Sequence, residues 1–116
     1  MTEPISTEHS KIEGIFTERR IYAFDISWRP DEAVSEYIVS CYDVNGKLIK
    51  QQKPGKDCKC TFNKLKAGNT YIAEVKSYIR ENGVRKNIAA EKIEVTLRKK
   101  NLISKIAVKY IKMTKK

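Results

Sequence analysis

The chain has 116 residues and a formal net charge of +10, from 24 lysine and arginine residues against 14 aspartate and glutamate residues. This length fits one domain with a single hydrophobic core. No run of about 18 apolar residues is present, which excludes a transmembrane helix, and residues 1–6 lack the basic start and apolar stretch of a signal peptide. We therefore expect a globular, monomeric protein without a transmembrane segment.

The positive charge is concentrated in the second part of the chain. Residues 1–43 contain four basic and nine acidic residues, whereas residues 44–116 contain 20 basic and five acidic residues. A cationic surface attracts acidic protein, nucleic acid or anionic membrane, but a lysine-rich surface also keeps a protein soluble. The central lysines are Lys47, Lys50, Lys53, Lys56, Lys59, Lys64 and Lys66.

The chain begins with a polar segment, residues 1–9, which we expect to be a flexible arm. Residues 12–16 are expected to form a first edge strand. In residues 21–28, apolar side chains alternate on one face and predict a strong strand, which Pro30 ends. The side chains on that face are Tyr22, Phe24, Ile26 and Trp28.

Short alternating segments continue to residue 97. Residues 37–42, 48–53, 58–62, 71–78 and 92–97 read as strands, bounded by glycine, proline and asparagine. The Asn-Gly pairs at 45–46 and 82–83 are typical of type I′ hairpin turns. About seven short strands with regular turns predict an all-β, seven-stranded antiparallel β-sandwich.

The segment from Leu65 to Tyr71 contains a leucine, a glycine at Gly68 and a tyrosine that begins an alternating run. This spacing is typical of a tyrosine corner, in which the phenol hydroxyl hydrogen-bonds the backbone a few residues upstream.

With Trp28 at the end of the second strand and Tyr37 at the start of the third, residues 10–98 resemble a fibronectin type III domain. The structural signature comprises Trp28, Tyr37, Leu65, Gly68 and Tyr71. Departures include Ala67, where the family usually has proline. The resemblance implies a non-catalytic module that presents loops and sheet faces to a partner protein. Most such domains are extracellular, and a minority are intracellular.

Residues 99–116 form a basic extension with a different periodicity. Apolar residues recur at helical spacing at Leu102, Ile103, Ile106, Tyr110 and Met113, and lysines recur on another side at Lys105, Lys109, Lys112 and Lys116. We expect an amphipathic helix, although the alternation of Ile106, Val108 and Tyr110 also permits a strand. The helix could contact an anionic membrane, an acidic groove of a partner, or the domain itself.

Few residues of the sequence would support a catalytic function. The single histidine, His9, lies in the polar arm, and no phosphate-binding glycine loop or metal-binding motif is present. We expect neither an enzyme nor a cofactor. The three cysteines, Cys41, Cys58 and Cys60, are interpreted as small core residues, with a Cys41–Cys60 disulfide as the alternative. Their odd number, and the lack of a glycosylation sequon, slightly favour an intracellular location over secretion.

The expected function is protein–protein interaction through a sheet face carrying Tyr42 and Tyr78 and through loops 29–36 and 80–87. Tyr42 and Tyr78 lie on outward positions of neighbouring strands, where they would either contact a partner or stabilise the sheet. The other candidate contacts are Lys47, Lys50, Lys105, Lys109 and Lys112. The alternatives are nonspecific binding of polyanions such as nucleic acid or anionic membrane, and an accessory role in an extracellular receptor or enzyme.

Overall fold

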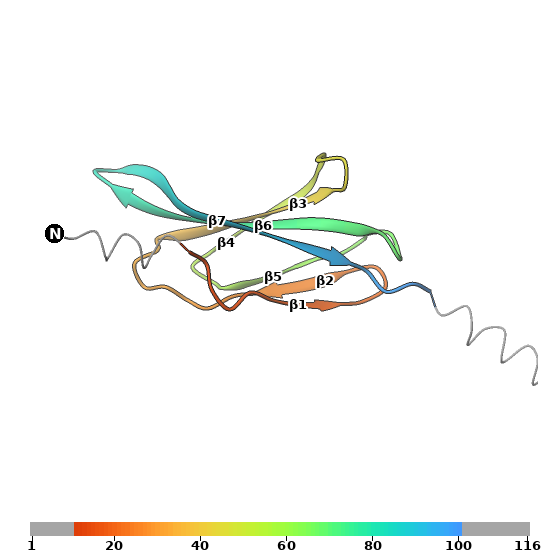
Figure 1. Ribbon diagram of the computed structural model, residues 1–116. Coiled ribbons are helices and arrows are strands. Elements are labelled where there is room, and N and C mark those ends of the chain that lie inside the picture. Colours follow the sequence, from red (N-terminus) through yellow and green to blue (C-terminus); the bar gives the residue numbers. More distant parts are fainter. Residues whose placement is uncertain (1–10, 101–116) are drawn as a thin grey trace, which may run out of the picture.

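The computed structural model describes residues 11–100, which form two antiparallel sheets packed face to face (Figure 1). One sheet has the order β1 (Phe16–Arg19), β2 (Phe24–Ser27), β5 (Lys59–Phe62). The other has the order β4 (Leu48–Gly55), β3 (Glu36–Asp43), β6 (Thr70–Glu81), β7 (Val84–Thr96). The predicted seven-stranded sandwich is confirmed. The predicted helix, with Lys105, Lys109 and Lys112, lies outside the described residues.

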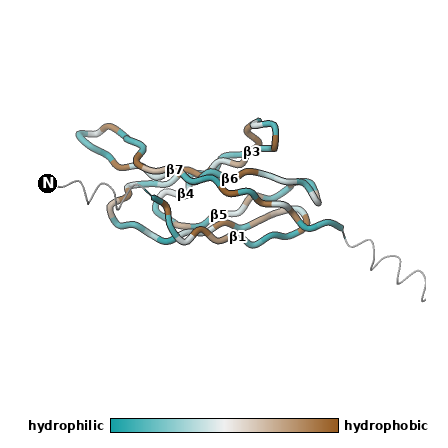
Figure 2. The backbone as a smooth tube through the Cα atoms, viewed as in Figure 1, coloured by the Kyte–Doolittle hydropathy of each residue, from teal (hydrophilic) through white to brown (hydrophobic). Residues whose placement is uncertain are grey.

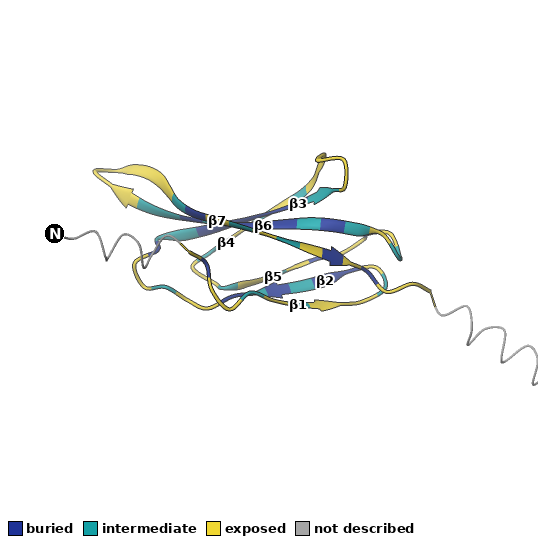
Figure 3. Ribbon diagram, in the orientation of Figure 1, coloured by how far each residue is buried: buried dark blue, intermediate teal, exposed yellow. Residues whose placement is uncertain are grey.

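The core lies between the two sheets, and its strand residues come from β2, β3, β5, β6 and β7; Figure 3 shows the buried residues on the ribbon. Phe24 and Ile26 of β2 are fully buried, as is Phe62 of β5, whose ring centre lies 5.4 Å from that of Phe24. At one end of the core, the rings of Trp28 and Tyr37 meet edge to face at 5.2 Å. The period-two pattern of the sequence therefore gives the correct inward face for the central strands.

The tyrosine corner is formed as predicted. The hydroxyl of the buried Tyr71 accepts a hydrogen bond from the Lys66 main-chain N–H at 3.0 Å. Gly68 has a φ of 76°, a left-handed conformation that glycine adopts at little cost. Leu65 is buried beside them and donates its main-chain N–H to the carbonyl of Tyr22.

Tyr22 itself is not a core residue, contrary to the alternation over residues 21–28. Its side chain is 48% exposed, because β2 begins only at Phe24 and residues 20–23 form the turn after β1. The main-chain N–H of Arg20 closes this turn by donating to the carbonyl of Ala23. A turn breaks the period of two, so Tyr22 leaves the inward face.

The first strand also differs from the prediction. It spans Phe16–Arg19 rather than residues 12–16, although Ile12 is buried and joins the core. Gly14 has a φ of 68°, outside the range of a strand, and separates Ile12 from β1.

The two Asn-Gly turns have different geometries. Asn82 and Gly83 both have positive φ, at 54° and 79°, as the predicted type I′ turn requires. At the other turn only Gly46 has a positive φ, so the type I′ prediction for residues 45–46 is wrong. There the side chain of Asp43 accepts hydrogen bonds from the N–H groups of Asn45 and Lys47, which favours a longer turn.

Candidate protein-binding site

Tyr42 and Tyr78 lie on the outer face of the four-stranded sheet, on the neighbouring strands β3 and β6, as predicted. The register nevertheless separates them, because Tyr42 lies opposite Ile72 whereas Tyr78 lies opposite Glu36. The interval from Ile72 to Tyr78 corresponds to about 20 Å along a strand at ~3.4 Å per residue. The two tyrosines are therefore at opposite ends of the face and do not form one patch.

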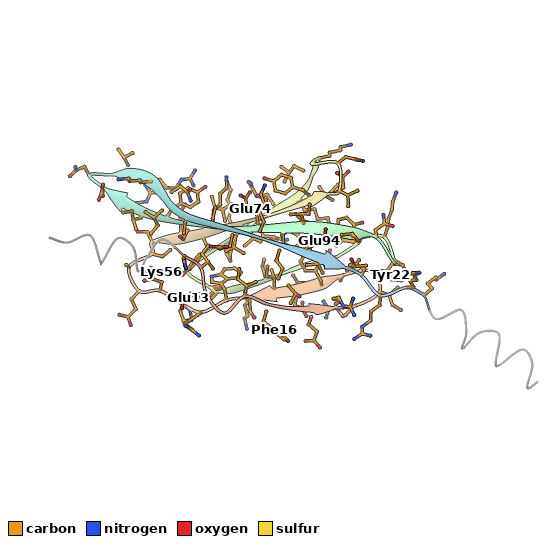
Figure 4. The ribbon with its side chains drawn as sticks, in the orientation of Figure 1. Glu13, Phe16, Tyr22, Lys56, Glu74 and Glu94 are labelled. Atoms are coloured by element: carbon orange, nitrogen blue, oxygen red, sulfur yellow. The ribbon has the colours of Figure 1, made fainter. Side chains whose placement is uncertain are left out.

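Each tyrosine has a partner within the domain. Tyr42 is half-buried, and its hydroxyl donates to Oε1 of Glu74 at 3.3 Å. Glu74 is only 9% exposed although it lies on the outer face of β6 (Figure 4), and the Lys76 ammonium lies 4.0 Å from the same oxygen. This cluster stabilises the sheet locally and presents little free polar surface. The alternation in the sequence predicts that Glu74 points outward, but nothing in the sequence indicates that Glu74 is buried.

Tyr78 belongs to a second cluster, near the turn of the β6–β7 hairpin. The guanidinium of Arg85 lies 4.9 Å from the centre of the Tyr78 ring and donates to Glu36 at 2.8 Å. Arg80 lies 3.9 Å from the other oxygen of Glu36. The hydrogen bond from Arg85 lowers the pKa of Glu36 below its ordinary value of 4.5. The sequence predicts the hairpin, but not that Glu36 would link it to β3.

The hairpin projects from the end of the sandwich at which loop 29–36 also lies (Figure 1). The main-chain N–H of Ser35 in this loop donates to the carbonyl of Tyr78 at 2.7 Å. Residues 80–87 are exposed, and Val84 beside the turn is 65% exposed. Figure 2 shows hydrophobic residues interspersed among hydrophilic ones along this hairpin. Beside loop 29–36, Lys56 and Cys58 border an open hollow of about 410 Å³. Loop 29–36 and hairpin 80–87 therefore lie at the same end of the sandwich, and the hairpin is its more exposed part.

Comparison with solved structures agrees with this geometry. The chicken CNTN1 FN1–FN3 domains match at a TM-score of 0.63 with 12% identity, over 78% of this chain and 31% of the chicken chain. The FN5 domain of Drosophila Lar matches at 0.58 with 14% identity, over 78% of this chain and 98% of its own. The fold is that of a fibronectin type III domain.

A third match is the central fibronectin III array of RIM-binding protein, at a TM-score of 0.59 and 16% identity, over 82% of this chain and 34% of that one. No protein-family model matches the sequence of this fibronectin type III-like domain. No curated protein matches it by sequence either. At these identities the structural matches establish the fold, and the chain spans about a third of the two multidomain structures.

The lysines of the fibronectin type III-like domain are dispersed rather than gathered at Tyr42. Lys47 is exposed in the β3–β4 turn. Lys50 lies opposite the inward-facing Cys41, and its ammonium donates to the main-chain carbonyl of Asn63. Lys50 thus connects the two sheets and is not free on the outer face. Lys105, Lys109 and Lys112 lie beyond the described residues.

The cysteines of this domain are all free, so the alternative Cys41–Cys60 disulfide is not formed. Cys41 is buried, while Cys58 and Cys60 are half-buried and pack against the core. Burial raises the pKa of Cys41 to about 11 and that of Cys60 to about 12, so both are protonated at neutral pH.

Within residues 11–100, no group of three or more metal-ligating side chains and no helix able to span a membrane occurs.

Proposed function

We propose that this domain is a non-catalytic protein–protein interaction module that binds its partner through the end formed by loop 29–36 and hairpin 80–87. The observation that carries the proposal is the hydrogen bond between Arg85 and Glu36 at 2.8 Å, with Arg85 also stacked on Tyr78. This contact links the projecting hairpin to β3, and we infer that it limits the movement of the exposed tip. A preorganised loop loses less conformational entropy on binding, and more of the contact energy appears as affinity.

The chemistry of this end also suits a protein partner. Tyrosine and arginine are enriched among the residues that dominate binding energies, and Tyr78, Arg80 and Arg85 lie together there. Val84 adds an exposed apolar side chain at the tip. Tyr42, at the opposite end of the sheet and hydrogen-bonded to Glu74, is proposed to stabilise the sheet and not to contact this partner.

The test is affinity capture from a lysate of the natural source at about 0.3 M salt, where screening removes loose electrostatic contacts. Captured proteins are compared between the wild type, Val84→Ser and Val44→Ser. The two valines are exposed to similar extents, 65% and 62%. Val84 lies beside the β6–β7 turn and Val44 lies in the β3–β4 turn, at opposite ends of the sandwich (Figure 1). We expect Val84→Ser to weaken capture about fivefold or more, since an apolar contact is lost, and Val44→Ser to leave it unchanged.

Tyrosine variants give an independent result. Tyr78→Ala should weaken capture while Tyr42→Ala leaves it unchanged, once equal folding has been checked by circular dichroism. Equal effects of the two valine variants, or unchanged binding by Tyr78→Ala, would contradict the proposed surface. Capture of only nucleic acid and acidic proteins, lost at about 0.3 M salt, would instead support polyanion binding by the lysines.

A further inference from the structure

The edges of the two sheets differ in how well they are protected from pairing with another strand. An unpaired edge presents main-chain N–H and C=O groups that can extend the sheet. β1 and β5 have only four residues each. The carbonyls of Thr61 in β5 and of Asn63 just after it accept hydrogen bonds from the side chains of Gln52 and Lys50. β4 carries two lysines, Lys50 and Lys53, and ends in Pro54 and Gly55. Its pairing with β3 also has two register shifts.

β7 is the long and regular edge. It has 13 residues, and its pairing with β6 is unbroken from Ala89 to Thr96, without proline or glycine. Its outward-facing side chains in this segment are small or charged, and the strand forms the rim of the four-stranded sheet (Figure 1). Among the edges in the described part of the chain, β7 is the one best suited to pair with a further strand.

The hydrogen bonding shows which main-chain groups of β7 are available. Leu97 donates its N–H to the carbonyl of Asn69, which places Leu97 among the residues that bond toward β6. In an antiparallel ladder the direction alternates with each residue. Ala90, Lys92 and Glu94 therefore direct their N–H and C=O groups to the open side. Thr96 is the next residue in this alternation. Its carbonyl also points away from β6, since it accepts a hydrogen bond from Arg19 at 3.0 Å.

The side chains of Lys92 and Glu94 lie on the same outer face and are both exposed; Glu94 is labelled in Figure 4. Within residues 11–100, no hydrogen bond or ion pair engages either side chain. When an edge strand pairs antiparallel with a copy of itself, two opposite charges that are two residues apart face each other if the pairing is centred on the residue between them. That residue is Ile93, which packs against the core from the inner side.

We propose that β7 pairs antiparallel with β7 of a second copy of this chain, about a two-fold axis at Ile93. In this register Lys92 lies opposite Glu94 of the second copy, and each exchanges main-chain hydrogen bonds with the other. A register centred on Lys92 would oppose two lysines, and one centred on Glu94 would oppose two glutamates, both of which are unfavourable. Charge therefore selects the register centred on Ile93, and the two four-stranded sheets become continuous.

Sedimentation equilibrium of the full chain over about 10 μM to 1 mM tests this pairing. We expect the apparent mass to rise from 13.4 kDa toward twice that value. Lys92→Glu places two glutamates opposite each other at both symmetry-related positions, and should weaken dimerisation about tenfold or more. Glu94→Lys should act similarly. The double variant Lys92→Glu, Glu94→Lys restores opposite charges and should recover dimerisation close to that of the wild type.

Hydrogen exchange locates the interface. Exchange of the Lys92 and Glu94 amides should slow with rising concentration, while the Val95 amide, which bonds to β6, should not respond. A monomer at all concentrations would overturn the proposal. A dimer whose association is insensitive to Lys92→Glu, or is not recovered in the double variant, would overturn it as well. Because Lys92 and Glu94 lie away from the 80–87 hairpin, partner capture through Val84 is a separate outcome.

Discussion

At the scale of single residues, the Tyr71 hydroxyl shows how a core aromatic ring can also hold a loop. The ring is buried between the sheets, and the hydroxyl accepts the main-chain N–H of Lys66. A buried main-chain donor that loses its partner costs about 1–3 kcal/mol. The hydroxyl thus fixes the connection between β5 and β6, and with it the start of the longest pair of strands.

Replacement of Tyr71 by phenylalanine removes this acceptor and keeps the ring. We expect the free energy of unfolding, measured by urea denaturation, to fall by about 1 kcal/mol. Tyr22→Phe is the matched control, since Tyr22 is 48% exposed and its side chain makes no hydrogen bond in the described part of the chain. Equal losses for the two variants would show that the Tyr71 hydroxyl does not hold the corner.

At the scale of elements, the β6–β7 hairpin depends on its turn and on the charged contacts that link it to β3. Asn82 and Gly83 supply the left-handed turn that matches the twist of the strands. One residue pair before the end of the ladder, Arg80 and Arg85 lie opposite each other, and both contact Glu36 of β3. An exposed ion pair contributes little by itself. This one joins three strands, and its effect should be seen in the opening of the hairpin and not in global stability.

Acid should weaken the contacts of Glu36 with Arg80 and Arg85. The pKa of Glu36 is lowered in the folded protein by its hydrogen bond from Arg85. The stabilisation is therefore complete above the ordinary value of 4.5 and is lost as the pH falls through the lower, folded pKa. We expect hairpin amides to exchange faster, relative to core amides of β3, as the pH falls below about 4.5. Glu36→Gln should show this faster relative exchange already at pH 7, and an unchanged ratio would exclude the role of Glu36.

At the scale of the whole molecule, the packing of the two sheets buries a phenol and two thiols and raises their pKa values. Burial raises the pKa of Tyr37 to about 12, that of Cys60 to about 12 and that of Cys41 to about 11. Tyr37 and Cys41 belong to one sheet and Cys60 belongs to the other. Their protonated forms are thus a property of the packed sandwich, which exists only when both layers are in place.

Alkaline pH should therefore destabilise the fold. For groups whose pKa is raised on folding, the stabilisation is complete below the unfolded value, 9.0 for cysteine, and is lost as the pH rises through the folded value. We expect the urea midpoint to fall steadily from pH 9 toward pH 11. The double variant Cys41→Ala, Cys60→Ala, though less stable at pH 7, should show a smaller fall. A fall of the same size in both proteins would assign the alkaline effect to other groups.

The sequence by itself determined the sandwich, the tyrosine corner and the inward faces of β2, β3 and β6. Period-two alternation and left-handed glycine are local properties, which follow from backbone sterics and strand geometry. The same local signals failed at Tyr22 and at residues 45–46, where a turn interrupted the alternation or lengthened the loop.

Only the tertiary structure decided how the outer surface is used. It placed Tyr42 and Tyr78 at opposite ends of one face, because the register between β3 and β6 sets which residues face each other. It also joined Glu36 to Arg85, which are 49 residues apart in the chain, and left Lys92 and Glu94 together on an open edge. Such contacts depend on strand order and register, which arise from packing the whole core and which no local pattern encodes.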